Sequence, residues 1–301
     1  MPKDKLLTIS NLSTCSRKVF QEITVVNRIE SLLEDMNLVP CSMSEQLVIG
    51  DMVRNTNVFH ASEIGRTTGK SPNGRYPMGC ARALFYSYTN APAEGSWTPR
   101  NRRILDTGTA IHGQLQMYLA EVARRRKKTE TFEKEAGISP ETNPIADVLD
   151  ISGHTDGIYT ITLPHLEVRF GIEIKSINDA GFKATKSIHP EHAVQGTIYQ
   201  ACLDLPVMLF LYYNKNDSNM AEFLQVFDPA IWHEIEKKVN EVRACMYKKV
   251  LPLQEVGFGC KTCKYKAICK PPQRMRGPMA LNAFRTNRRP VEEVTNANTG
   301  G

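Results

Sequence analysis

The stretch from Gly153 to Lys175 constrains the fold of this chain more than any other segment. It reads GHTDGIYTITLPHLEVRFGIEIK, and two apolar-rich runs, 158–162 and 168–175, flank a turn that contains Pro164. Short runs rich in β-branched residues and separated by a turn residue are typical of paired strands. We therefore expect a β-hairpin here.

The polar residues of this hairpin fall at one end of it. Side chains along a strand alternate between faces, so Glu173 and Lys175 share one face while Ile172 and Ile174 point to the other. Asp156 opens the first run. The hairpin would then present two carboxylates and an ammonium together, which suits a divalent cation and phosphate chemistry.

Length and composition favour a globular protein. The chain has 301 residues, of which 41% are hydrophobic and 23% are charged, enough to bury a sizeable core. No apolar run approaches the roughly 20 residues that span a bilayer, and the first residues lack the apolar core of a secretory signal. We expect a cytoplasmic protein without a membrane partner, whose eight cysteines are ligands or thiols and not disulfides.

Basic residues are concentrated near the C-terminal end. Residues 243–289 hold 12 Lys and Arg against one acidic residue, Glu255, although the whole chain has 38 Lys and Arg and 32 Asp and Glu. The remainder is therefore net acidic. This asymmetry predicts that the C-terminal portion faces a polyanion.

Periodicity predicts the remaining elements. We expect helices at 16–36, 80–88, 108–126, 193–203 and 231–247, an edge strand at 132–138, and strands at 207–213 and 222–227. Together they predict an α/β fold with a mixed central sheet flanked by helices, a helical N-terminal part and a C-terminal cysteine-bearing segment. Residues 65–71 (GRTTGKS) resemble a phosphate-binding P-loop, but only three residues separate the glycines and Pro72 follows, so we expect a solvated loop.

Three more residues extend the hairpin pattern. His112 lies on the predicted 108–126 helix, although a lone helical histidine is more often a core or surface residue. Gln195 and Tyr199 are four residues apart, so they lie on one helix face and can address one substrate strand. An E-x-K pair alone is common, but the full order of helix histidine, strand aspartate, E-x-K and Q-x-x-x-Y is harder to obtain by chance.

This order resembles the PD-(D/E)XK nuclease superfamily, and within it the RecB-like exonucleases that include CRISPR-associated and phage-borne stand-alone forms. The resemblance covers roughly residues 58–270 and implies a restriction-endonuclease-like core. It implies that His112, Asp156 and Glu173 bind Mg²⁺ or Mn²⁺, that Lys175 orients water or stabilises charge, and that Gln195 and Tyr199 contact the substrate. Thr155 stands where the family has proline, and Glu135 is a weaker candidate for a further acidic contact.

Cys260, Cys263 and Cys269 place three thiols within ten residues, and a Cys₄ site needs a fourth ligand. We choose Cys80, with Cys245 as the alternative. Spacing does not separate a [4Fe–4S] cluster from a structural Zn²⁺, since both take four cysteines; the resemblance favours iron–sulfur. We expect this cluster to anchor a DNA-binding surface whose phosphate contacts are Lys264, Lys266, Arg274 and Arg276.

These patterns predict three regions: a helical N-terminal region (1–57), a nuclease domain with its cysteine cluster (58–270) and a basic tail (271–301). The predicted function is a metal-dependent DNA exonuclease in recombination, degradation or processing of DNA. A structure-specific endonuclease and a non-catalytic iron–sulfur DNA-binding module are the alternatives. No helicase or ATPase motif is present in the sequence, so unwinding of duplex DNA would need a recombination or helicase partner.

Overall fold

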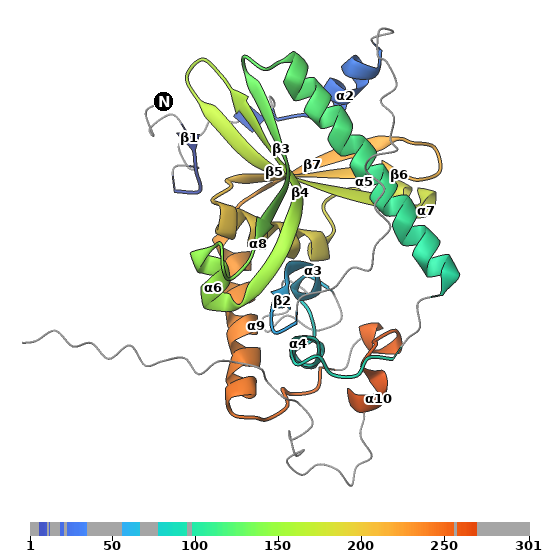
Figure 1. Cartoon of the computed structure of the whole chain (residues 1–301), viewed down its shortest axis with the longest axis vertical. Helices are drawn as coiled ribbons and strands as arrows, with labels where there is room; N and C mark the ends of the chain where they lie inside the picture. Colours follow the sequence, from blue (N-terminus) through green and yellow to red (C-terminus); the bar gives the residue numbers. More distant parts are fainter. Residues whose placement is uncertain are drawn as a thin grey trace, which may run out of the picture.

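The computed structural model describes residues 6–10, 12, 19–20, 23–34, 56–66, 78–94, 98–255 and 258–269. In this part of the chain, a seven-stranded mixed sheet lies between helices (Figure 1). Its strands run in the order β2-β4-β5-β6-β7, with β3 also paired to β4 and β1 to β5. Their bounds are β1 Leu6–Leu7, β2 Phe59–His60, β3 Glu130–Ile138, β4 Ile151–Thr162, β5 Glu167–Ile177, β6 Val207–Asn214 and β7 Met220–Val226.

The structure confirms the expected mixed α/β core. β3, β4 and β5 form an antiparallel meander, and β6 then pairs with β5 in parallel and with β7 in antiparallel fashion. A parallel pair requires a crossover connection, which helix α8 (Pro190–Leu203) supplies. The succession α5–β3–β4–β5–α8–β6 is consistent with a restriction-endonuclease-like core. Within the described residues β3 pairs with β4 alone, so it is the edge strand that was predicted.

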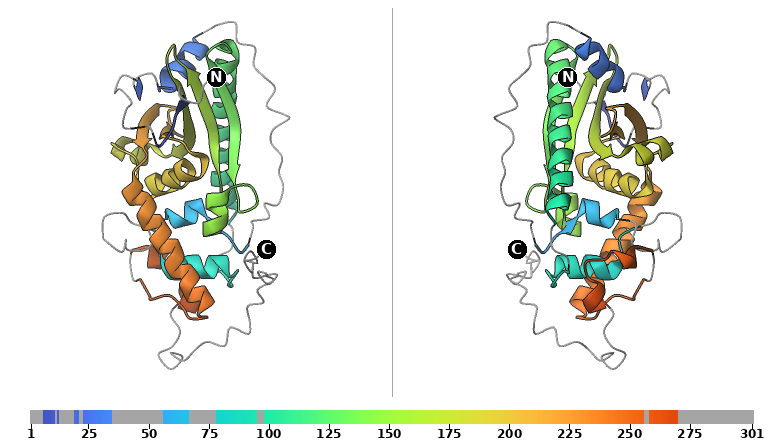
Figure 2. Two further views of the ribbon diagram at one scale, coloured as in Figure 1. Left: turned by 90° about the vertical axis from the view of Figure 1, so that its left-hand side faces the viewer. Right: turned by 90° about the vertical axis from the view of Figure 1, so that its right-hand side faces the viewer.

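Helices cover both faces of the sheet, as the side views in Figure 2 show. One face packs against α2 and α5, and this apolar cluster includes Ile172 and Ile174 of β5. The other face packs against α4, α8 and α9, and its cluster includes Phe210 and Tyr212 of β6. The helices are α2 Val26–Leu33, α3 Ala61–Ile64, α4 Ala81–Tyr88, α5 Pro99–Arg125, α6 Pro144–Leu149, α7 Asp179–Ala184, α8, α9 Pro229–Tyr247 and α10 Lys266–Cys269, with a 3-10 turn at Phe258–Lys261.

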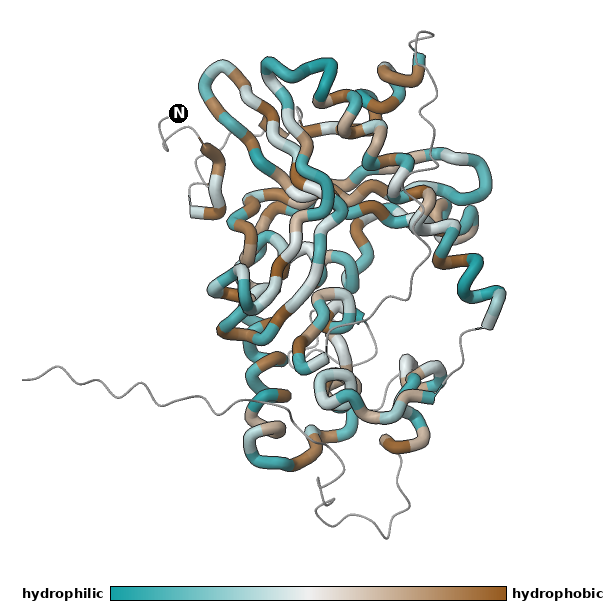
Figure 3. The backbone as a smooth tube through the Cα atoms, viewed as in Figure 1, coloured by the Kyte–Doolittle hydropathy of each residue, from teal (hydrophilic) through white to brown (hydrophobic). Residues whose placement is uncertain are grey.

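The hydrophobic segments of the chain lie mostly in the central strands, while the hairpin tips and the exposed ends of α5 are hydrophilic (Figure 3). No helix in the described residues is long and apolar enough to cross a membrane. Residues before position 58 contribute to the same core, because β1 pairs in parallel with β5 and Ile29 of α2 packs in the α5-side cluster.

The predicted helix at 16–36 is wrong in extent. Residues 23 and 24 are not helical, and α2 begins only at Val26. The cause is a long-range contact: Glu222 Oε2 on β7 accepts hydrogen bonds from the backbone N–H groups of Val25 (2.7 Å) and Val26 (3.1 Å). The carboxylate therefore binds the first free donors of a helix whose own N-cap, Val25, provides no side-chain acceptor.

The predicted helix at 108–126 begins too late. Helix α5 starts at Pro99, with the Thr98 hydroxyl accepting a hydrogen bond from the Asn101 N–H at 3.2 Å. Its first turns have no buried apolar stripe, since residues 99–107 are all exposed. Periodicity missed them for that reason, although a threonine followed by proline is a recognisable helix start.

Several sequence predictions lie outside the described residues. They are the loop at 67–71 within the P-loop-like segment, and the basic tail at 271–301 with Arg274 and Arg276.

Candidate active site

The candidate site lies where β4 and β5 separate. Their backbone ladder runs from the pair Thr162–Glu167 to the pair Gly157–Ile172 and then stops. Beyond it, side chains of β4 bridge the gap: the Thr155 hydroxyl donates to the Ile172 carbonyl oxygen at 2.6 Å, and Asp156 Oδ2 accepts from the Ile174 N–H at 2.6 Å. Asp156 is thus held at the split between the two strands by a backbone donor.

Helix α5 reaches the same carboxylate from the other side. His112 Nδ1 lies 3.0 Å from Asp156 Oδ1. One turn further along α5, Gln116 Nε2 donates to the Asp156 backbone carbonyl at 2.8 Å. The structure therefore brings His112 and Asp156 together as predicted, and adds Gln116. Its spacing of four from His112 is the signal that places it on the same helix face.

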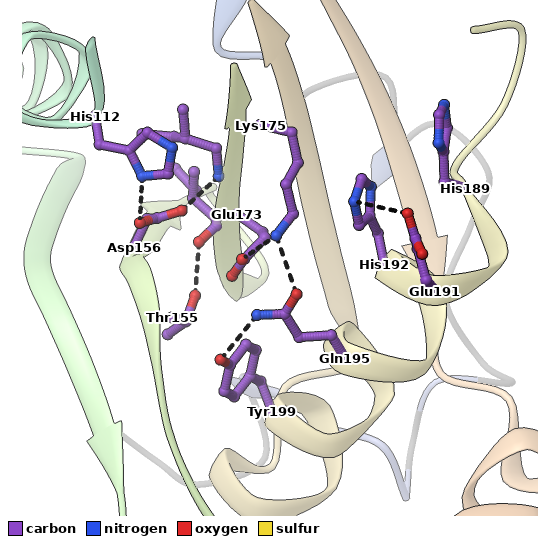
Figure 4. Close-up of polar contacts among 12 residues, drawn as sticks. His112, Thr155, Asp156, Glu173, Lys175, His189, Glu191, His192, Gln195 and Tyr199 are labelled. Atoms are coloured by element: carbon purple, nitrogen blue, oxygen red, sulfur yellow. Dashed lines mark hydrogen bonds and ion pairs between the residues drawn. The ribbon is translucent and has the colours of Figure 1, made fainter. Parts of the chain in front are cut away.

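Glu173 and Lys175 form the second half of the site (Figure 4). Lys175 Nζ donates to Glu173 Oε1 at 2.7 Å and to Gln195 Oε1 at 3.0 Å. Gln195 Nε2 in turn donates to the Tyr199 hydroxyl at 3.1 Å. Six residues singled out in the sequence thus come together from α5, β4, β5 and α8: His112, Asp156, Glu173, Lys175, Gln195 and Tyr199.

Glu173 is the most perturbed acid of this group. Its side chain is buried, and Oε2 has no hydrogen-bond partner among the described residues. Burial raises the pKa of Glu173 to about 7, and the nearby Asp156 adds to the rise while Lys175 opposes it. A buried carboxylate oxygen without a partner costs free energy, so a cation that bound there would relieve this cost.

Gln195 and Tyr199 are placed deeper than a substrate-contacting pair needs to be. Gln195 is 8% exposed and Tyr199 is 2% exposed. Gly153 of β4 allows this depth, because a Cβ there would lie 3.0 Å from the Tyr199 ring. In the structure the two side chains support Lys175, and their direct contact with a substrate stays a prediction. The weaker candidate Glu135 is exposed on β3 with a φ of 55°.

In the described residues, no group of three or more His, Cys, Asp or Glu side chains is arranged to hold a metal ion. The site nevertheless offers two carboxylates, one of them with an oxygen free of hydrogen bonds in the described structure. Mg²⁺ is commonly bound through only one or two carboxylates, with water and substrate phosphates completing its shell. Asp156 and Glu173 fit that requirement.

The four cysteines singled out in the sequence line one cavity. Cys80, at the start of α4, faces Cys260, Cys263 and Cys269, and Glu255 and Tyr86 complete part of the wall. Burial raises the pKa of Cys80. The four thiols line a common cavity, but they do not form a group that could hold a metal ion in the described structure. Neither the iron–sulfur cluster nor the zinc alternative has support here, and Cys245 does not line the cavity.

Backbone carbonyl groups of the C-terminal segment accept hydrogen bonds from a side chain of α4. Arg82 donates to the carbonyl oxygens of Pro252 at 2.7 Å and Cys269 at 3.2 Å. Of the predicted phosphate contacts, Lys264 lies 3.3 Å from Glu63 and over the Tyr265 ring, while Lys266 is exposed at the cavity wall. Their binding to DNA stays a prediction.

Comparison with known proteins assigns no family. No family model and no curated protein matches the chain. Among solved structures, an alkaline exonuclease from Laribacter hongkongensis (LHK-Exo) is similar at 19% identity and a TM-score of 0.40, over 64% of this chain and 89% of that one. Its complex with dAMP gives 18% identity and 0.32, over 63% and 92%. A protein named SSO0001 gives 15% and 0.37, over 83% and 97%. These similarities are too low to support an argument about this chain.

Proposed function

We propose that this protein is a metal-dependent nuclease that hydrolyses phosphodiester bonds in DNA, acting as an exonuclease. One observation carries the proposal. Two hydrogen-bonded sets, His112 with Asp156 and the chain Glu173–Lys175–Gln195–Tyr199, come from four elements and meet at a split in the sheet, where Asp156 accepts from the Ile174 N–H next to Glu173. Asp156 and Glu173 provide two carboxylates beside Lys175. The Lys175 ammonium is hydrogen-bonded to Glu173 and Gln195. This arrangement matches the needs of phosphate-ester hydrolysis.

The residues of this chain would act as follows. Asp156 and Glu173, with His112 as the predicted third ligand, would hold Mg²⁺ or Mn²⁺; in the described structure His112 Nδ1 lies 3.0 Å from Asp156 Oδ1. The metal, when bound, would supply Lewis-acid stabilisation of the phosphate and an activated water. Lys175 would stabilise negative charge that develops on the phosphate. Gln195, which is hydrogen-bonded to Tyr199, accepts a hydrogen bond from the Lys175 ammonium and so orients it.

Because its pKa is raised to about 7, Glu173 is partly protonated near neutral pH in the absence of a cation. A ligand carboxylate must be ionised. Cation binding would therefore release a proton and strengthen as the pH rises through this range. No step of the proposed reaction is assigned to the cysteine cavity.

The proposal is tested with purified protein and end-labelled linear DNA. Mg²⁺ or Mn²⁺ should support degradation, and EDTA should abolish it. Lys175→Ala and Asp156→Ala should each lower the rate by about 10²–10³-fold, since each removes an electrostatic contribution to the reaction. Lys183→Ala is the matched control, because Lys183 is an exposed lysine paired with Asp179 on α7.

Equal rates in the wild type and Lys175→Ala would refute a nuclease that uses this site. Linear and circular DNA, single- and double-stranded, separate the alternatives. Cleavage of circles indicates an endonuclease, and binding without cleavage of any substrate indicates a non-catalytic binding module. Roles in recombination, and a helicase or recombination partner, stay predictions.

A further inference from the structure

Two histidines at the start of α8 lie beside the candidate site without belonging to it. His189 is the N-cap of α8. The helix begins at Pro190, and His192 is the third residue of its first turn. Their rings are stacked, with centroids 5.2 Å apart and an interplanar angle of 11°. The His192 ring also lies over Phe210, with centroids 6.4 Å apart, and contacts Tyr212. The pair is therefore fixed on the sheet by ring packing.

The register of the sheet places His192 close to Glu173 and Lys175. In the parallel pairing of β5 and β6, Glu173 is opposite Phe210 and Lys175 is opposite Tyr212. Neighbouring strands are about 4.8 Å apart, so the imidazole that covers Phe210 and Tyr212 is one strand away from Glu173 and Lys175. Figure 4 shows His192 beside Lys175, on the side away from His112 and Asp156.

The hydrogen bonds around the Tyr212 hydroxyl favour one tautomer of His192. The Tyr212 hydroxyl accepts from the His189 backbone N–H at 3.1 Å, so its own proton is available for His192 Nδ1 at 2.8 Å. Nδ1 then accepts, and in a neutral imidazole the other nitrogen, Nε2, is the donor. This arrangement, in which the Tyr212 hydroxyl donates to Nδ1, corresponds to the Nε2–H tautomer of His192.

The two histidines differ in what this donor does. His189 Nε2 lies 2.9 Å from the Thr185 hydroxyl, which donates its own proton to the Gly181 carbonyl at 2.8 Å and so accepts from the imidazole. His192 Nε2 has no hydrogen bond within the described residues; the Glu191 carboxylate oxygen Oε1 lies 3.9 Å from it. That distance is too long for a hydrogen bond, and the Glu191 side chain is 38% exposed.

The surroundings keep His192 neutral. Burial lowers the pKa of His192 to about 3, and the charges of Lys175 and His189 lower it further in the same direction. A neutral N–H beside an ammonium does not repel it, so both groups can interact with the same anionic ligand. The unused hydrogen-bond donor at Nε2 and the positive charge of Lys175 together favour an anionic hydrogen-bond acceptor.

We propose that His192 Nε2–H binds a non-bridging phosphate oxygen of the DNA strand, at the phosphate next to the one addressed by Lys175. This proposal rests on the proposed nuclease function and extends its substrate-binding surface from β5 to the first turn of α8. The competing explanation is a packing histidine that fills the space between α8 and Phe210. Phenylalanine and glutamine separate the two: phenylalanine keeps the flat ring without the donor, and glutamine keeps an uncharged N–H donor without the ring.

The experiment compares the wild type, His192→Phe, His192→Gln and a control, His165→Gln, in the exposed turn between β4 and β5. Binding of a fluorescein-labelled single-stranded oligonucleotide is measured by anisotropy in EDTA, and cleavage kinetics in Mg²⁺. Loss of one hydrogen bond to a charged group should raise Kd and KM about tenfold in His192→Phe, with kcat changed much less. His192→Gln and the control should stay within about threefold of the wild type.

The contact is refuted if His192→Phe binds as the wild type does, or if the Phe and Gln variants lose affinity equally. Thermal unfolding of each variant shows whether the fold is intact. Failure of the nuclease proposal looks different: the wild type does not cleave in Mg²⁺ or Mn²⁺. In that case the anisotropy measurement still decides whether His192 contacts the strand.

Discussion

Thr155 shows how one side chain maintains the geometry of the candidate site. It is fully buried, and its hydroxyl donates to the Ile172 carbonyl at 2.6 Å, where the β4–β5 ladder has already ended. The family that the sequence resembles has proline at this position, which offers no such donor. In this chain the hydroxyl takes the place of a backbone hydrogen bond and keeps β5 close to Asp156.

We expect Thr155→Val to lower the free energy of unfolding by about 1–3 kcal/mol, because it conserves shape but leaves the buried Ile172 carbonyl without this donor. Thr155→Ser keeps the hydroxyl and should lose about 1 kcal/mol or less, for one buried methyl group. Urea denaturation measures both. Thr131→Val, at an exposed position on β3, is the control. A Thr155→Val variant as stable as the wild type would show that the hydrogen bond contributes nothing.

At the scale of single elements, α2 depends on a strand far away in the sequence. The Glu222 carboxylate on β7 receives the N–H groups of Val25 and Val26. No acidic residue lies in the first turn of α2 itself. A carboxylate at a helix N-terminus satisfies free donors and interacts favourably with the helix dipole.

Glu222→Ala should therefore lower the free energy of unfolding by about 1–2 kcal/mol, the usual range for losing an N-terminal cap. Glu222→Gln keeps an acceptor oxygen but no charge, and should lose less. Denaturant midpoints of these variants are compared with that of Glu30→Ala, which removes an exposed carboxylate from α2 itself. If the Glu222 and Glu30 variants were equally stable, the contact would not be a cap.

The same elements show how far the sequence could predict the fold. The strands at 207–213 and 222–227, the hairpin and the helix at 231–247 were predicted correctly, because their apolar periods are local. The start of α2 was not, since it is set by Glu222 from β7. The order of residues in the sequence predicted six side chains that the structure brings together, but not the contacts of Gln116, Thr155 and His192. Those contacts depend on how the helices and strands pack, which local sequence patterns do not show.

At the scale of the whole molecule, a buried ion pair joins the C-terminal segment to the core. Lys238 of α9 is 1% exposed, and its Nζ lies 2.6 Å from Glu255 Oε1. Glu241 Oε2, one turn further along α9, is 3.9 Å from the same Nζ, and its side chain is 40% exposed. Glu255 also lines the cavity that contains the four cysteines. The pair thus fixes the chain just before Cys260, as Arg82 fixes it on either side.

Removing one member of a buried pair costs more than removing both, because the remaining charge is left uncompensated. Lys238→Ala should lower the free energy of unfolding by about 3–5 kcal/mol. The double variant Lys238→Met with Glu255→Gln should recover most of that loss, since neither residue is then charged and the methionine retains the packing of the lysine stem. Chemical denaturation measures both, with exposed Lys237→Ala as the control. A double variant no more stable than Lys238→Ala would mean that an uncompensated Glu255 charge does not cause the loss, and that this ion pair does not hold the C-terminal segment.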